Sequence, residues 1–167
     1  MSIEIERRFL VEGRSWENNA LSVHNIRQGY LTSDKKGWTT RIRIEDQDKA
    51  WLSIKSKSSD MSNNEFEYCI PINDAEEIWK LTKEKIYKTR YDLNLKRGKW
   101  IVDCFHKKNH PLIIAEVELT FESETIEKPE WCTVEITGKY RWSNAYLAKA
   151  PISIWPIKKR LFDPKRP

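Results

Sequence analysis

Pairs of like charges, separated by one residue and flanked by apolar side chains, recur along the chain. In a β-strand, alternate side chains point to opposite faces, so both members of a pair share one face and their apolar neighbours share the other. The stretch I-E-I-E-R-R-F-L-V at residues 3–11 is the first example, with Arg7 as the only charge on its apolar face. The acidic pairs are Glu4/Glu6, Glu65/Glu67 and Glu116/Glu118, and the basic pairs are Arg41/Arg43, Lys55/Lys57 and Lys88/Arg90.

Strands dominate the predicted secondary structure, and they do not alternate with helices. We expect strands at residues 2–12, 24–31, 38–45, 51–57, 65–72, 87–93, 100–105, 112–121 and 131–136. A helix capped by Asn73 or Asp74 is predicted to run to Lys83, and Ser143 is predicted to cap a short helix to about residue 149. This order favours an antiparallel sheet, closed or nearly closed, with helices added at its edges.

The bulk properties indicate one domain over residues 1–167, with a basic C-terminal tail at 151–167 that we expect to lie on its surface. The net charge of +5 is a mild excess that favours an anionic ligand but does not single out nucleic acid. The three cysteines show no CxxC spacing and are typical of reduced thiols. No signal-peptide pattern is present, and no apolar run approaches the roughly 20 residues of a membrane span, so we predict a cytoplasmic protein.

The charge pairs fit two architectures. In one, the charged face is the wet outside of a barrel or sandwich; in the other, the charges line a wide barrel and the apolar face is covered from outside. Several strands carry charges of a single sign, although a solvated sheet usually mixes signs to gain cross-strand pairs. Basic pairs suit phosphate oxygens, and acidic pairs suit Mg²⁺ or Mn²⁺. Both together would describe a site for a metal-chelated polyphosphate.

The stretch at residues 3–11 resembles the ExExK signature of the CYTH family, the triphosphate tunnel metalloenzymes. Further segments match in the right order: R-Q-G-Y-L at 27–31, R-I-R at 41–43, S-I-K at 53–55, E-F-E at 65–67, K-T-R-Y at 88–91, V-D-C-F at 102–105, E-V-E at 116–118 and G-K-Y at 138–140. The resemblance implies a mainly β, α+β fold: a closed eight-stranded antiparallel barrel with a charged interior and a few peripheral helices. It also implies one or two divalent metals, and members of the family often form homodimers.

The resemblance also implies roles for individual residues. Metal-facing carboxylates would be Glu4, Glu6, Glu116 and Glu118, with Asp103, Glu135, Glu65 and Glu67 as further candidates for a second metal or a water. The phosphate-binding residues would be Arg8, Arg41, Arg43, Lys55, Lys88, Arg90 and Lys139, with Tyr30 as a positioning residue. Glu4, Glu6, Lys88, Glu116 and Glu118 would be catalytic. The lysine of the motif is replaced by Arg8, which keeps the charge but does not readily lose its proton.

The favoured function is metal-dependent hydrolysis of a triphosphate, most simply inorganic tripolyphosphate to pyrophosphate and phosphate. The R-Q-G-Y-L and K-T-R-Y segments resemble the inorganic triphosphatase branch more than the class IV adenylyl cyclase branch. Thiamine triphosphatase stays open. A non-catalytic polyphosphate-binding module is a further alternative, although the three intact acidic pairs favour an enzyme.

Overall fold

The computed structural model describes residues 2–33 and 38–156. The predicted turn at 33–37 falls mostly outside this range, as does the basic end of the predicted tail. The strands are β1 (Ser2–Val11), β2 (Ala20–Ser33), β3 (Trp38–Glu45), β4 (Lys49–Lys57), β5 (Ser62–Cys69), β6 (Glu84–Leu93), β7 (Lys99–Phe105), β8 (Ile113–Glu118) and β9 (Cys132–Glu135). The helices are α1 (Ile72–Leu81) and α2 (Asn144–Lys149), with short 3-10 helices η1 (Ser15–Asn19), η2 (Lys107–Asn109), η3 (Tyr140–Trp142) and η4 (Ile152–Ile154).

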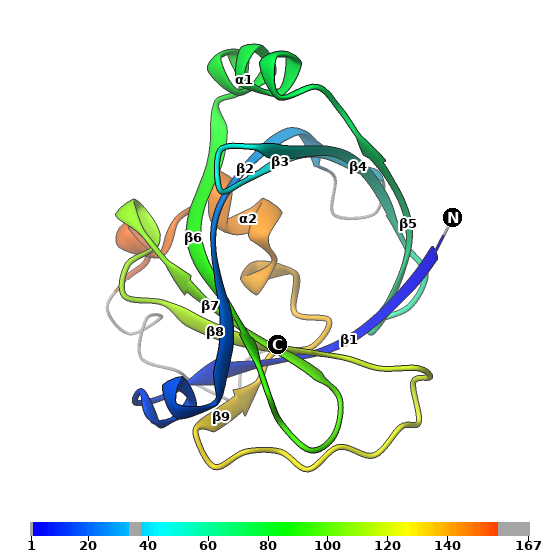
Figure 1. Ribbon diagram of the computed structural model, residues 1–167, viewed down its shortest axis with the longest axis vertical. Coiled ribbons are helices and arrows are strands. Elements are labelled where there is room, and N and C mark those ends of the chain that lie inside the picture. Colours follow the sequence, from blue (N-terminus) through cyan, green and yellow to red (C-terminus); the bar gives the residue numbers. More distant parts are fainter. Residues whose placement is uncertain (1, 34–37, 157–167) are drawn as a thin grey trace.

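Eight of these strands close into an antiparallel barrel in the order β5-β4-β3-β2-β6-β7-β8-β1, and β1 pairs back with β5. Figure 1 looks into this ring, with β1 completing the circle beside β5. The first residues of β1 pair with β5, and its later residues pair with β8 on one side and β9 on the other. The predicted eight-stranded barrel is therefore confirmed, with β9 as an addition beside β1.

The charged faces of the strands point into the barrel and the apolar faces point outward. Register brings Arg8 opposite Glu116 and Arg90 opposite Asp103 on the inner face. Outside, α1 covers β3 and β4 by packing Ala75 and Trp79 against the core of that wall (Figure 1). The outer faces of β1, β7 and β8 contribute to a second apolar cluster around Trp100 that includes Trp16 of η1. Stability thus rests largely on apolar layers outside the ring.

One end of the barrel is apolar on its inner face and is filled by the chain that follows β9. Leu10, Phe105 and Ile114 form a buried cluster there with Ala145 and Leu147 of α2. In Figure 1, α2 lies within the outline of the ring. We call residues 136–149 the plug segment. It leaves the remainder of the barrel interior lined by polar and charged groups.

Several predicted boundaries are wrong, among them the end of the strand expected at 65–72, which stops at Cys69 because α1 begins at Ile72. Strand β8 ends at Glu118 rather than residue 121, because a turn follows in which the N–H of Glu124 donates to the carbonyl of Phe121 (3.0 Å). Helix α1 begins at Ile72, directly after Pro71 and without a side-chain cap, so the predicted caps Asn73 and Asp74 lie inside its first turn. Strand β2 begins at Ala20, four residues early, because it pairs with β6 as far as Leu93.

Gly98 gives a test of the outer packing. Its φ of +76° favours glycine, and a Cβ there would lie 2.5 Å from Cγ2 of the buried Val117. Gly13 has a similar φ of +71° but nothing within 4 Å. We predict that Gly13→Ala lowers the free energy of unfolding by about 1 kcal/mol through backbone strain, and that Gly98→Ala costs about 1–3 kcal/mol more through overpacking. Urea denaturation measures both; equal losses would contradict the steric contribution.

Candidate active site

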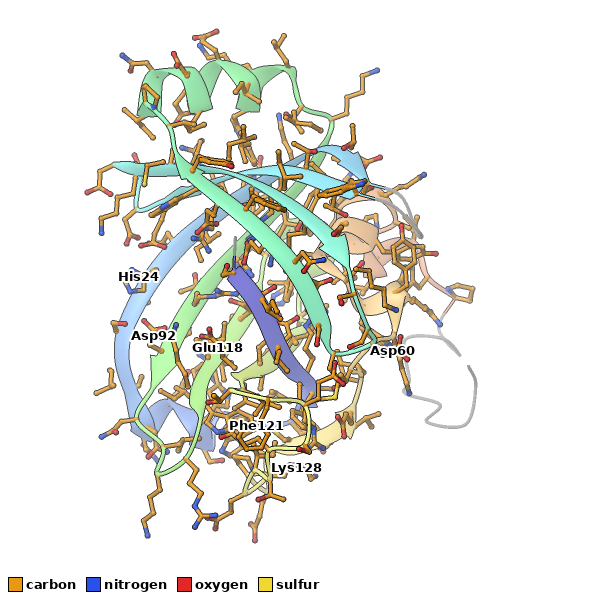
Figure 2. All side chains as sticks on the ribbon, turned by 90° about the vertical axis from the view of Figure 1, so that its right-hand side faces the viewer. His24, Asp60, Asp92, Glu118, Phe121 and Lys128 are labelled. Carbon is orange, nitrogen blue, oxygen red and sulfur yellow. The ribbon has the colours of Figure 1, made fainter. Side chains whose placement is uncertain are left out.

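The interior of the barrel is hollow and opens at two places. The first cavity has a volume of about 1230 Å³ and reaches the β4–β5 turn and the plug segment. The second has a volume of about 420 Å³ and reaches His24, Asp92 and Glu118. In Figure 2, these three residues lie toward the left of the barrel and Asp60, which borders the first cavity, lies toward the right. The cavities meet at Glu4, Glu6, Arg43, Glu65, Glu67, Arg90 and Glu116, which line both.

The signs of charge are sorted between the walls. The strands β8, β1 and β5 are consecutive in the ring and carry the three acidic pairs. The strands β4, β3 and β6 carry the basic pairs, with the largely uncharged inner face of β2 between β3 and β6. The interior therefore has an acidic wall and a basic wall, and Arg8 is a cation on the acidic wall.

The acidic wall holds more negative charge at its centre than its partners compensate. Glu116 accepts from Arg8 Nε (2.9 Å) and Arg90 Nη2 (3.1 Å). Glu6 has Arg8 Nε at 3.6 Å, beyond a good hydrogen bond. Burial, followed by repulsion from Glu116, raises the pKa of Glu6 to about 7. A carboxylate in this condition is suited to a cation beside it.

The other predicted acidic residues differ in their access to the interior. Glu4 accepts from Lys55 Nζ at 2.5 Å, and the same nitrogen lies 3.2 Å from Glu65. Glu67 accepts from Ser53 Oγ (2.8 Å). Glu118 is exposed at the second cavity and pairs with Lys99 at 2.9 Å.

Guanidinium groups on both walls carry buried donors for which the described residues supply no acceptor. Within the described part of the chain, Arg8 Nη2, Arg41 Nε and Arg43 Nε are buried and have no hydrogen-bond partner. An unpaired buried donor costs about 1–3 kcal/mol, and more when it is charged. Burial, followed by repulsion from Arg41, lowers the pKa of Arg43. Donors of this kind are chemically suited to an anion with several oxygen atoms.

Asp103 holds the basic residues of β6 in place. It accepts from Lys88 Nζ (2.5 Å) and from Arg90 Nε and Nη2 (both 2.8 Å), so both of its oxygens are engaged. Burial would raise its pKa, but Arg90 and Lys88 outweigh burial and lower it well below the usual range. Burial, followed by repulsion from Arg90, lowers the pKa of Lys88 to about 8. The structure thus places Asp103 among cations rather than with the other candidate metal-facing carboxylates.

Glu135 is the one predicted carboxylate that the structure puts on the outside of the barrel. Register aligns Glu135 with Phe9, whose side chain faces outward, and Arg7 binds its two oxygens at 2.8 and 2.7 Å. The expectation of Glu135 as a metal ligand inside the barrel therefore has to be corrected. Its four-residue strand was too short for alternation to reveal which face it used.

Tyr30 and Lys139 both line the first cavity. The buried Tyr30 hydroxyl donates to Gln28 Oε1 at 3.2 Å, and Lys139 is exposed on the plug segment. Sequence reasoning missed Gln28 and Ser53, although both lie two residues from a predicted site residue and thus share its face. It also missed the plug segment, because those contacts join residues far apart in the chain.

A second group of possible metal ligands lies at the rim of the second cavity. His24 Nδ1 lies 3.0 Å from Asp46 and 3.6 Å from Glu45, and its Nε2 lies 3.4 Å from Asp92. Asp46 also accepts from the backbone N–H of Asn25 (2.8 Å). These hydrogen bonds explain why the side chains gather there: they hold β2 to the β3–β4 turn.

Comparison with known proteins agrees with this geometry. The model of the CYTH domain matches residues 2–146. The chain belongs to the CYTH family. An inorganic triphosphatase of Acetivibrio thermocellus is 39% identical over 153 residues, which cover 90% of this chain and 96% of that protein. The crystal structure of the inorganic triphosphatase NE1496 superimposes with a TM-score of 0.62 at 30% identity, over 89% of this CYTH chain and 95% of that one.

More distant structures share the fold of this CYTH chain. A putative adenylyl cyclase from Hippeastrum gives a TM-score of 0.55 at 17% identity, over 71% of this chain and 80% of that one. Among the described residues, no helix has the length and apolar character needed to cross a membrane.

Removing the negative charge of Asp103 tests the buried network. We predict that Asp103→Asn lowers the free energy of unfolding by about 3–5 kcal/mol, because it leaves the buried Lys88 without its counter-charge and Arg90 with Glu116 alone. Glu135→Gln is the matched control, since Glu135 also binds an arginine through two oxygens but at the surface, and should cost less than about 1 kcal/mol. Urea denaturation measures both, and similar losses would show that the interior pairing adds nothing.

The contribution of the His24 hydrogen bonds to stability should depend on pH. The hydrogen bond to Asp46 outweighs burial, and with Glu45, Asp46 and Asp92 it raises the pKa of His24. Because the pKa of His24 is higher in the folded than in the unfolded protein, protonated His24 contributes its full stabilisation below the unfolded-state pKa near 6.5. This contribution is lost as the pH rises through the folded-state pKa. We predict that His24→Gln costs up to about 1 kcal/mol more at pH 5.5 than at pH 9. Thermal unfolding at both pH values measures this difference, and a pH-independent cost would contradict it.

Proposed function

We propose that this chain hydrolyses a triphosphate, with inorganic tripolyphosphate as the substrate and pyrophosphate and phosphate as products. The observation that carries the proposal is the interior with an acidic and a basic wall, in which buried guanidinium donors find no acceptor among the described residues. The inorganic triphosphatase from Acetivibrio thermocellus supports it, because 39% identity extends over 90% of this chain.

The basic wall would bind the phosphate oxygens. Arg41 and Arg43 on β3 and Arg90 on β6 are planar donors suited to two oxygens each, and Lys55 adds a point charge from β4. Lys88 is fully enclosed with Asp103, so its charge would act on the phosphates mainly through its field and through the position of Arg90. Lys139 would contact the part of the substrate nearest the first opening.

The acidic wall fits a divalent cation. Glu4, Glu6 and Glu116 line both cavities, and burial, followed by repulsion from Glu116, raises the pKa of Glu6. Glu118 lies farther out, at the second cavity. Oxygen-only donors suit Mg²⁺ or Mn²⁺, and such an ion would supply charge neutralisation and polarisation of a phosphate oxygen.

The residues of the chain then have distinct roles in hydrolysis. The substrate would lie between the walls, with its bridging oxygens beside Arg41, Arg43 and Arg90. A water molecule attacks the terminal phosphorus, the bond to the bridging oxygen breaks, and pyrophosphate leaves with the electron pair. The guanidinium groups would stabilise the charge that develops on the leaving oxygen.

The first cavity also supports a second candidate, an organic triphosphate. Tyr140, Trp142 and Tyr146 line this cavity beside the charged part, and Ile136 adds an apolar surface. Such a surface suits an aromatic group attached to the triphosphate. The adenylyl cyclase and thiamine triphosphatase alternatives belong to this class of substrate.

Phosphate release from tripolyphosphate, ATP, thiamine triphosphate and pyrophosphate, each with Mg²⁺, Mn²⁺ or EDTA, tests the proposal. We expect metal-dependent release that is fastest with tripolyphosphate. Preference for ATP or thiamine triphosphate would favour the second candidate. Tight binding of tripolyphosphate without release under any condition would identify a binding module and overturn the proposal.

Glu4→Gln should separate catalysis from folding. Within residues 2–33 and 38–156, Lys55 is the side chain that donates to Glu4, so loss of this carboxylate should leave the barrel folded while removing a charge from the acidic wall. We expect tripolyphosphate hydrolysis to fall by at least about 100-fold, in the range seen when groups that stabilise transition-state charge are removed. Glu12→Gln, outside the barrel interior, is the control and should keep full activity. Unchanged turnover in Glu4→Gln, with the fold intact by circular dichroism, would contradict the assignment of the acidic wall.

A further inference from the structure

Arg8 stands where the ExExK motif has lysine, and its side chain makes contacts in two directions. Its Nε donates to Glu116 Oε1 at 2.9 Å on the acidic wall. Its Nη1 donates to the backbone carbonyl of Trp142, in the plug segment, at 3.2 Å. Its Nη2 is buried and has no partner within residues 2–33 and 38–156. One guanidinium group therefore joins the acidic wall to the plug segment and keeps a donor available.

The backbone of Arg8 contacts the same segment. The N–H of Arg8 donates to Thr137 Oγ1 at 3.0 Å, and the N–H of Ile136 donates to the carbonyl of Arg8 at 2.8 Å. With the bond to Trp142, three hydrogen bonds link Arg8 to residues 136–142. Arg8 is thus a direct connection between the phosphate site and the chain that leads into α2.

The plug segment forms the less charged part of the first cavity. Its residues Tyr140, Trp142, Asn144 and Tyr146 line the cavity beyond the charged walls. Oδ1 of Asn144 is buried there without a partner among the described residues. The position of this segment therefore determines how much room, and of what polarity, is open to anything attached to a triphosphate.

We propose that Arg8 is a positioning residue that determines substrate specificity. By binding Glu116 and the Trp142 carbonyl at once, from the lining of the first cavity, Arg8 fixes the plug segment close to the bound phosphates. The cavity then accepts an inorganic triphosphate and disfavours one that carries a bulky organic group. This inference rests on the proposed function, and it concerns the choice between its two candidate substrates.

The geometry requires arginine rather than lysine. A guanidinium group has donors on three nitrogens in a rigid plane, so it reaches Glu116, Trp142 and a phosphate oxygen in different directions. Lysine has a single nitrogen at the end of a flexible chain. Lysine at position 8 would keep the positive charge and one or two of these contacts, but it would not span all three.

Arg8→Lys tests the proposal through a ratio of activities. The measurement is kcat/KM for tripolyphosphate divided by kcat/KM for ATP, with the same metal. We expect this ratio to fall by about fivefold to tenfold in Arg8→Lys, because the plug segment is no longer held in place. A role limited to phosphate binding or to folding would lower both activities together and leave the ratio unchanged. Arg7→Lys, at the neighbouring outward-facing position, is the matched control and should not change the ratio.

A second variant changes the plug segment without altering the charged walls. Ser143 Oγ accepts from the N–H of Tyr146 at 3.2 Å and caps α2, so Ser143→Ala should loosen the helix. We expect a fall of the ratio in the same direction. Hydrogen exchange at the amides of Leu147 and Ala150, which bond within this helix, should be faster in Arg8→Lys than in Arg7→Lys.

The outcomes separate this inference from the proposed function. If the wild-type protein releases no phosphate from tripolyphosphate, the proposed function fails. If the wild-type protein is active but Arg8→Lys keeps the wild-type ratio and the wild-type exchange rates in α2, the positioning role is overturned. Faster exchange with an unchanged ratio would also overturn it, because the plug segment would then not govern the choice of substrate.

Discussion

Compensation of buried charge is the constraint on which this structure depends. The inner face of the ring is lined by ionisable groups, and a buried charge is tolerated only when it is paired and hydrogen-bonded. Asp103 meets this condition fully, since it binds Lys88 and Arg90 through both oxygens. The centre of the acidic wall does not, because Glu6 and Glu116 repel each other and Arg8 is shared between them. The buried charge of the barrel is thus incompletely compensated where both cavities meet. A ligand that carries both positive and negative charge would stabilise the barrel most at that point.

Acidic and basic side chains lie on separate walls because the strands that carry the same sign are close together in the ring. Like charges opposite each other on paired strands are unfavourable, yet Glu6 faces Glu118 across β1 and β8. If acidic and basic strands alternated around the ring, this repulsion would disappear. The interior would then lack a continuous basic wall for an anion and a continuous acidic wall for a cation. The stability lost in this way is supplied outside the ring, where α1 and the cluster around Trp100 bury apolar side chains.

The alternation of charged and apolar side chains along each strand is the part of the sequence that predicts this fold. Spacing at i, i+2 correctly grouped the charges on common faces, and the resemblance to the CYTH family gave the inward direction that alternation leaves open. Glu135 shows the limit, because the face used by a four-residue strand depends on its register with β1, and that register shifts between Phe9 and Val11. Asp103 shows another limit, since only the pairing of β6 with β7 puts Arg90 opposite it. The helix of the plug segment was predicted with its Ser143 cap, but its position inside one end of the barrel was not, because packing against Leu10 and Ile114 joins residues distant in sequence.

Arg7 and Arg8 show how strongly the fold decides what a residue does. They are adjacent and chemically identical, and alternation sends one outward and the other inward. Arg7 pairs with Glu135 at the surface, where such a pair is worth little. Arg8 is buried between a carboxylate and a backbone carbonyl, and one of its donors has no acceptor. An oxygen acceptor at that donor would offset the cost of burying it, so the burial of Arg8 supports the proposed binding of phosphate. Under the proposed function the polar interior is the site itself, and that role would explain why charges stand where apolar residues would pack more stably.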